Sequence, residues 1–143
     1  MKAITLNWAL SQEYDQVRAL YKTCGYGGGL IDSDRVVVAG DGKIVAAVRI
    51  CRENDVLILR GMQVKQEYQR KGIGLAMLRF LQNQMDMSGC FCLPYKHLVN
   101  FYAQIGFEEI SPKDAPSFLA GRLEKYRGNG NREITIMQIK NDI

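Results

Sequence analysis

A polar segment with two glycines is the part of this chain whose residue types and spacing best suit chemistry. It reads VKQEYQRKGIG over residues 64–74, after a run typical of a strand and before one typical of a helix. Gly72 and Gly74 let the backbone approach a ligand closely, and the first turn of a helix offers N–H groups with partial positive charge. Arg70 and Lys71 add full positive charges. The segment therefore predicts a site for a phosphate or pyrophosphate group.

The segment differs from the two common nucleotide-binding motifs. It has neither the Lys-Ser/Thr ending of a triphosphatase loop nor the three spaced glycines of a dinucleotide site. A helix that begins at a glycine and binds nothing would show the same letters. The motif alone therefore leaves a phosphate site and a plain helix start as alternatives.

Hydrophobic periodicity predicts the elements that position this segment, in the order strand, helix, three strands, helix, strand, helix, strand, helix, strand. The run at residues 56–64 is apolar on both faces, so it should be a central strand. We expect strands at residues 2–9, 35–39, 43–51, 56–64, 90–93, 107–110 and 133–139. We expect helices at residues 14–24, 73–88, 98–105 and 116–126.

Glycines mark two further places of interest. Residues 24–29 read CGYGGG, which ends the first helix and predicts a mobile loop at the border of a site. Gly61 interrupts the central strand, which indicates a bulge or the close approach of a ligand. Tyr21 and Tyr26, beside the glycine run, are candidates to touch a substrate, although surface aromatics near a loop are common.

Composition limits the class of protein. The chain has 143 residues, 47% hydrophobic and 24% charged, which predicts one soluble domain over residues 1–143. The 19 basic and 15 acidic residues give a net charge of +4 that is dispersed along the chain, so no nucleic-acid partner is expected. No run is long and apolar enough to span a membrane, and no signal region opens the chain, so we expect a cytoplasmic protein. The sequence leaves a homodimer as an open alternative.

The four cysteines are expected to be reduced and structural rather than metal ligands. Cys90 and Cys92 are separated by one residue, whereas a zinc pair normally leaves two to four, and a second pair is missing from the sequence. We therefore expect no metal site. His97, the sole histidine, is expected to be a solvated or capping residue.

Two motifs resemble those of the GNAT superfamily of N-acetyltransferases. Gln69, Gly72 and Gly74 match its pattern of Gln or Arg, two residues, Gly, one residue, then Gly or Ala, and NFYAQIGFEEI at residues 100–110 resembles its second motif. With the order of elements, the chain is similar to this family over nearly its whole length. The resemblance implies an α/β (α+β) fold. Its single sheet would be mixed, mostly antiparallel, six- to seven-stranded and splayed between strands 4 and 5, with about four helices.

The resemblance also implies a chemistry, with acetyl-CoA as the cofactor. Backbone groups of Met62 and Val64 would bind the pantetheine arm and polarise the thioester carbonyl. A neutral primary amine of a small molecule or protein would attack the thioester directly. Tyr102 falls where the family's general acid is usually found, and we favour this role; the alternative is a core aromatic, because Tyr102 shares an apolar helical stripe. The pyrophosphate would be held by Gln69, Arg70, Lys71, Gly72, Ile73 and Gly74.

Some roles stay open at this stage. The general base is water, Glu53 or absent, and Arg60 either holds an acidic acceptor or forms a structural salt bridge. Tyr95 stands where relatives often carry an asparagine that contacts pantetheine, so this contact is in doubt. Two other classes of protein compete with an enzyme. One is an acyl-CoA-binding sensor module without turnover, and the other is a basic interaction domain.

Overall fold

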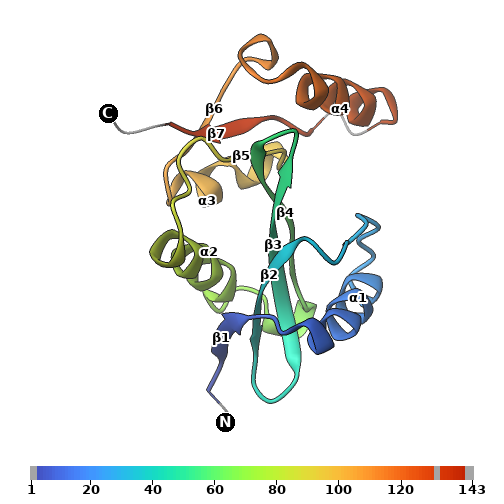
Figure 1. Ribbon diagram of the computed structural model, residues 1–143, viewed down its shortest axis with the longest axis vertical. Coiled ribbons are helices and arrows are strands. Elements are labelled where there is room, and N and C mark those ends of the chain that lie inside the picture. Colours follow the sequence, from blue (N-terminus) through green and yellow to red (C-terminus); the bar gives the residue numbers. More distant parts are fainter. Residues whose placement is uncertain (1–2, 131–132, 141–143) are drawn as a thin grey trace. The chain divides into compact units, whose positions relative to one another are not determined.

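The computed structural model describes residues 3–130 and 133–140, and within them the seven predicted strands and four predicted α-helices all form (Figure 1). Residue 2 of the first predicted strand lies outside the described residues. The strands are β1 (Thr5–Trp8), β2 (Arg35–Gly40), β3 (Ile44–Glu53), β4 (Val56–Val64), β5 (Phe91–Cys92), β6 (Phe107–Glu109) and β7 (Met137–Ile139). The helices are α1 (Tyr14–Thr23), α2 (Ile73–Gln84), α3 (Val99–Ala103) and α4 (Ser117–Gly128). Short 3-10 turns lie between them, η1 (Ser11–Glu13), η2 (Gln66–Tyr68), η3 (Lys96–Leu98) and η4 (Pro112–Asp114).

The described strands form one mixed sheet in the order β1-β2-β3-β4-β5-β7-β6. β4 and β5 are parallel, whereas β1 with β2, β2 with β3, β5 with β7 and β6 with β7 are antiparallel. This confirms the predicted mixed, mostly antiparallel sheet and the central place of β4. The parallel ladder is described for one residue pair, Ile58 with Phe91, while residues 61–64 of β4 are partly exposed. The short ladder agrees with the predicted splay between strands 4 and 5.

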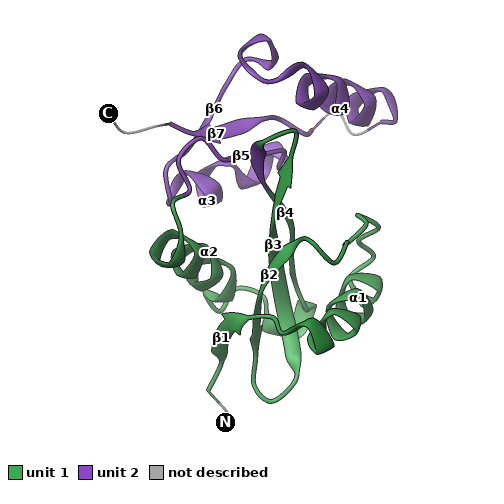
Figure 2. Cartoon of the chain, in the orientation of Figure 1, with its two compact units in different colours: residues 1–55, 59–86 green, residues 56–58, 87–143 purple. Residues whose placement is uncertain are grey.

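The chain divides into two compact units, shown in green and purple in Figure 2. Unit 1 contains residues 1–55 and 59–86, and unit 2 contains residues 56–58 and 87–143. Each unit therefore holds a part of β4. The single N-acetyltransferase domain expected over residues 1–143 stays a prediction.

In unit 1, α1 and α2 lie on opposite sides of β2 and β3 (Figure 1). Val17, Leu20 and Tyr21 recur at helical spacing on α1 and are at most 3% exposed, because this stripe packs on the strands. Helix α2 presents a similar stripe. Its buried residues are Ile73, Met77, Leu78 and Leu81.

In unit 2, helix α4 closes a second apolar core. Leu119 and Leu123 of α4, which are one helical turn apart, are at most 1% exposed. The cluster that they join also contains Ile58, Phe91, Ile134 and Ile136. Over the described ranges, no helix combines the length and the apolar content that a membrane crossing would need.

The last strand is shorter than predicted. Residues 133–139 were expected to form it, but β7 begins only at Met137. The backbone that precedes β7 forms hydrogen bonds with the loop after β5. Lys96 N–H donates to the Glu133 carbonyl at 2.6 Å, and Thr135 N–H donates to the Pro94 carbonyl at 3.0 Å. Alternating apolar residues therefore overstated the length of this strand.

Helix α2 also ends earlier than the predicted residues 73–88. It stops at Gln84, and Met85 is extended with φ −155° and ψ 163°. Its last residues, 82–84, read QNQ and are exposed, so the apolar stripe of the helix has already ended where the helix stops. The predicted start at Ile73 is confirmed.

Gly61 lies within β4, and other side chains occupy the space beside it. Its φ is +66°, in the left-handed region that favours glycine. A Cβ built on it would lie 2.5 Å from Tyr21 Oη and 3.1 Å from Arg49 Nε. The predicted close approach therefore exists, but it comes from the protein's own residues.

Replacing Gly61 should be costly for two separable reasons. We expect Gly61→Ala to lower the free energy of unfolding by about 2–5 kcal/mol, from left-handed backbone strain plus the clash with Tyr21 and Arg49. Gly25→Ala is the matched control, because Gly25 has φ +72° and nothing within 4 Å of its Cβ position. It should lose only about 1–2 kcal/mol. Urea unfolding followed by circular dichroism measures both, and equal losses would show that the contact at Gly61 is unimportant.

Candidate functional site

The polar loop predicted to bind an anion connects β4 to α2 through η2. Gln69 is extended, Arg70 has φ 62° and Gly72 has φ 80°, so the chain turns sharply twice before the helix begins. Gln69, Arg70, Lys71 and Gly72 are exposed. The basic side chains therefore lie at the surface, beside the start of α2.

The start of α2 offers backbone donors that the helix does not use. Its first hydrogen bond runs from Ala76 N–H to the Gly72 carbonyl at 3.0 Å, so the N–H groups of Ile73, Gly74 and Leu75 have no helical partner. No side chain of the described residues caps this end. A Cβ at Gly72 would meet nothing within 4 Å, so open space adjoins these donors. The arrangement fits a phosphate group.

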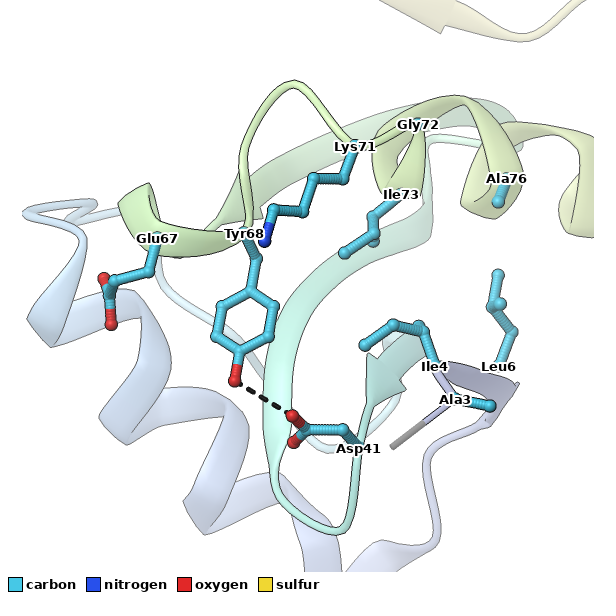
Figure 3. A pocket seen from close by; sticks show the side chains of 10 residues that line it. All are labelled: Ala3, Ile4, Leu6, Asp41, Glu67, Tyr68, Lys71, Gly72, Ile73 and Ala76. Carbon is cyan, nitrogen blue, oxygen red and sulfur yellow. Dashed lines mark hydrogen bonds between the residues drawn. The ribbon is translucent and has the colours of Figure 1, made fainter. Parts of the chain in front are cut away.

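Two hydrogen bonds fasten the loop to the rest of unit 1. Gln69 Nε2 donates to the Val64 carbonyl at 3.0 Å, which ties the loop to the end of β4. Tyr68 Oη donates to Asp41 Oδ2 at 2.9 Å, which ties it to the turn between β2 and β3 (Figure 3). The hydrogen bond to Asp41 raises the pKa of Tyr68. Sequence analysis missed both Tyr68 and Asp41 because their partnership spans distant parts of the chain.

A cavity of about 850 Å³ adjoins the loop within unit 1. Figure 3 shows Ile4, Leu6, Ile73 and Ala76 on its apolar side, and Lys71 extending toward the ring of Tyr68. Of the predicted loop residues, Lys71, Gly72 and Ile73 line the cavity, whereas Gln69, Arg70 and Gly74 do not. The remaining lining residues are Ala3, Asp41 and Glu67.

Met62 and Val64 lie on the second half of β4 and are partly exposed. Alternate residues of a strand direct their backbone groups to the same edge, so the two residues offer a pair of neighbouring polar groups there. The Val64 carbonyl already accepts the Gln69 amide and keeps a second lone pair.

A buried charge behind β4 was missed by sequence analysis. Arg49 of β3 is 0% exposed, and its Nη1 donates to Asp34 Oδ2 at 2.9 Å and to the Gly29 carbonyl at 2.6 Å. Its Nη2 donates to Tyr26 Oη at 2.9 Å. The charge is thus paired and hydrogen-bonded, as a buried ion must be. A lone arginine inside the apolar run at residues 43–51 was the signal for it.

The glycine run at residues 24–29, predicted to be mobile, is anchored at two points by this guanidinium. The Tyr26 hydroxyl and the Gly29 carbonyl both accept hydrogen bonds from the Arg49 guanidinium. The Tyr26 ring also meets the Tyr21 ring edge to face at 4.8 Å. A Cβ at Gly28 would collide with the Tyr26 hydroxyl, so a side chain there would push Tyr26 away from Arg49. The run therefore borders the buried charge of unit 1.

Arg60 and Glu53 pair with each other. Arg60 Nη1 lies 3.6 Å from Glu53 Oε2, and the two side chains are 26% and 30% exposed. This geometry supports the structural alternative for Arg60. Glu53, the carboxylate considered as a base, therefore has a cationic neighbour.

Tyr102 lies on α3 in unit 2 and is 7% exposed. Its ring meets Phe101 at 5.0 Å and Phe107 at 6.0 Å, both edge to face. The core role foreseen for the ring is therefore observed. These contacts involve the ring of Tyr102, and its hydroxyl keeps the ability to donate a proton.

The cysteines are all free thiols. Cys51, Cys90 and Cys92 are buried and Cys24 is half-buried. Burial raises the pKa of Cys51 to about 12 and also raises the pKa of Cys92 and Cys24. His97 is exposed and stacks on Tyr95 at 5.7 Å. A raised pKa keeps a thiol protonated. Cys24, Cys51 and Cys92 therefore do not favour a nucleophilic thiolate near neutral pH.

Thiol labelling at pH 8 tests this account. We expect Cys24 to react first and Cys51, Cys90 and Cys92 to react at least about tenfold more slowly, because their thiols are buried whereas that of Cys24 is half-buried. All should react at once in urea. The variant Cys24→Ser is the control and should remove the early phase. A fast phase that survives this substitution would contradict the assignment.

Residues 32–109, more than half of the chain, match the acetyltransferase (GNAT) domain. No curated protein matches the chain in sequence. Solved structures do match in fold, at identities too low to show more than the fold.

Three of these structures illustrate the range. N-acetylglutamate synthase from Neisseria gonorrhoeae, complexed with coenzyme A and N-acetyl-glutamate, has a TM-score of 0.69 at 18% identity, over 99% of this chain but only 36% of its own. The ribosomal-protein-S18-alanine N-acetyltransferase from Escherichia coli gives 0.68 at 14% identity, over 99% of this chain and 97% of its own. The PaiA N-acetyltransferase from Thermoplasma acidophilum, in complex with coenzyme A, gives 0.65 at 12% identity, over 97% and 99%.

The fold of these structures confirms the predicted GNAT fold, with its open seven-stranded sheet and parallel β4 and β5. The match over residues 32–109 includes the anion loop and α3. The sequence motifs, the uncapped start of α2 and this match agree. The chain belongs to the GNAT acetyltransferase family.

Proposed function

We propose that this GNAT domain transfers an acetyl group from acetyl-CoA to a primary amine of a small molecule or a protein. The observation that carries the proposal is the start of α2, where Ile73, Gly74 and Leu75 leave backbone donors beside the open space at Gly72. Two of the similar structures named above contain coenzyme A, which supports the same ligand here.

The loop at residues 69–74 would hold the pyrophosphate. The N–H groups at the front of α2 supply fixed donors, and the exposed Arg70 and Lys71 supply countercharge. Ile73 takes part through its backbone alone, since its side chain is 6% exposed and belongs to the core. Gln69 shapes the loop by its hydrogen bond to the Val64 carbonyl.

The chemistry needs few side chains. Bound acetyl-CoA supplies the reactive thioester. Backbone groups of Met62 and Val64 orient its arm, and an N–H at this edge stabilises the negative charge that develops on the carbonyl oxygen. Holding both reactants in place supplies much of the rate. Because the thiols with resolved pKa shifts are held protonated, direct attack by the amine suits the site better than an acyl-enzyme intermediate.

The reaction needs two proton transfers, one to the leaving thiolate and one from the attacking amine. Tyr102 gives a proton to the leaving thiolate, a role for which its phenol is suited and which the family resemblance supports. Glu53 is paired with Arg60 at 3.6 Å, so its carboxylate already has a cationic partner. Solvent water is then the simplest acceptor for the proton of the amine.

Charge at the loop gives a direct test of cofactor binding. We expect Gly72→Glu to weaken coenzyme A binding by about tenfold or more relative to Gly72→Gln, because only the carboxylate repels the phosphates. Both variants carry the same strain at φ 80°, so their difference isolates the charge. Isothermal titration calorimetry measures it. No heat with the unmodified protein, or equal affinities of the two variants, would refute the phosphate site.

The role of Tyr102 has its own test. We expect Tyr102→Phe to lower kcat about 100-fold with an unchanged KM for acetyl-CoA, since the substitution removes the proton donor and keeps the ring. Tyr126→Phe, in the same unit, is the control and should retain full activity. A loss of less than about threefold for Tyr102→Phe would leave the residue with a packing role alone.

Turnover separates an enzyme from a sensor. An amine panel with acetyl-CoA, followed by loss of the thioester absorbance, should show acetylation of at least one amine. Coenzyme A binding without turnover of any amine in the panel would favour the sensor module.

A further inference from the structure

Two buried hydrogen-bond donors in unit 1 point to an acceptor that the protein does not provide. Tyr21 on α1 is 3% exposed and Arg49 on β3 is 0% exposed. Among the described residues, neither Tyr21 Oη nor Arg49 Nε has a hydrogen-bond partner. An unpaired buried donor is costly, so two of them in one place call for an explanation.

Both donors converge on the same spot beside Gly61 of β4. The Cβ position of Gly61 lies 2.5 Å from Tyr21 Oη and 3.1 Å from Arg49 Nε. The guanidinium lies 5.9 Å from the centre of the Tyr21 ring, so the two groups are neighbours. The strand has a glycine here, which leaves the donors facing backbone instead of a side chain.

The charge at this spot is already balanced. Asp34 Oδ2 pairs with Arg49 Nη1 at 2.9 Å, and the other guanidinium contacts go to Gly29 and Tyr26. A ligand group that fits here should therefore accept two hydrogen bonds without adding charge to a buried site. A carbonyl oxygen has two lone pairs and no charge, and so meets both conditions.

The spot is next to the proposed reaction edge. Gly61 directly precedes Met62, and both are partly exposed. Tyr26, a partly exposed residue of the glycine run, lies against both donors' side chains: its Oη accepts from Arg49 Nη2 at 2.9 Å and its ring meets the Tyr21 ring at 4.8 Å. Moving Tyr26 would break its hydrogen bond with Arg49 Nη2, and the glycines on both sides of it give the backbone the conformational freedom for such a shift.

We propose that Tyr21 Oη and Arg49 Nε bind the carbonyl oxygen of the amine acceptor once Tyr26 moves aside. The acceptor class would then be α-amino amides and peptide amino termini, rather than simple alkylamines. This inference rests on the proposed acetyl transfer, and it names the substrate class of that site.

The test compares three acceptors that share one side chain, for example leucine amide, leucine and 3-methylbutylamine. The unmodified enzyme should have its lowest KM for the amide. Tyr21→Phe should raise that KM about tenfold, the equivalent of one good hydrogen bond, and leave the KM for the alkylamine unchanged. Arg49→Lys keeps a charge for Asp34 but lacks Nε, and it should shift the same KM in the same direction.

Stability provides a second readout. Tyr21→Phe removes a hydroxyl that has no partner, so its Tm should not fall. Tyr14→Phe, on the same helix, is the control, because Tyr14 Oη donates to the Asp34 carbonyl at 2.5 Å. This variant should lower Tm and leave the order of the acceptors unchanged.

The outcomes distinguish this proposal from the proposed function. A preference for leucine or for the alkylamine, or an amide KM that Tyr21→Phe does not change, would overturn the carbonyl site while acetyl transfer stands. A lower Tm for Tyr21→Phe would also count against it, because the hydroxyl would then be serving the free protein through water. If none of the three is acetylated, they are titrated into the coenzyme A complex, and binding of none overturns the proposal. Failure of acetyl transfer itself would appear as missing coenzyme A binding, or as coenzyme A binding without turnover of any amine in the wider panel.

Discussion

The buried guanidinium of Arg49 is the interaction on which unit 1 depends. Removing an ion from water costs several kcal/mol, and only close partners offset that cost. Asp34, Gly29 and Tyr26 provide them, so one side chain of β3 fixes the glycine run, the approach to β2 and the packing of α1. The same geometry places Tyr21 against β4 and requires glycine at position 61.

The anion loop depends on a different kind of constraint. Its ligands would be backbone groups, so their direction matters more than the identity of the side chains around them. Gln69 and Tyr68 set this direction by reaching back to Val64 and Asp41. The positive φ values of Arg70 and Gly72 complete the turn. Basic side chains at the surface then add attraction without having to be held in place.

The order of the elements and the anion loop could be predicted from the sequence because both depend on residues that are close together in the chain. Apolar spacing located every helix and strand, and Gly72 marked the start of α2. Boundaries that depend on distant partners were not predictable, as in the late start of the last strand at Met137. Arg49 was missed for the same reason, since its partners come from residues 26–34 and no local rule assigns them. Roles at Met62, Val64 and Tyr102 depend on a ligand, so they stay predictions.

The bond between Tyr68 and Asp41 gives the turn between β2 and β3 an unexpected importance. The two residues are 27 positions apart, yet a hydrogen bond of 2.9 Å makes the tip of this hairpin a brace for the loop. Surface turns of this kind usually tolerate insertions. Here a longer turn would move the Asp41 carboxylate away from Tyr68. The anion loop would then lose this hydrogen bond although none of its own residues had changed.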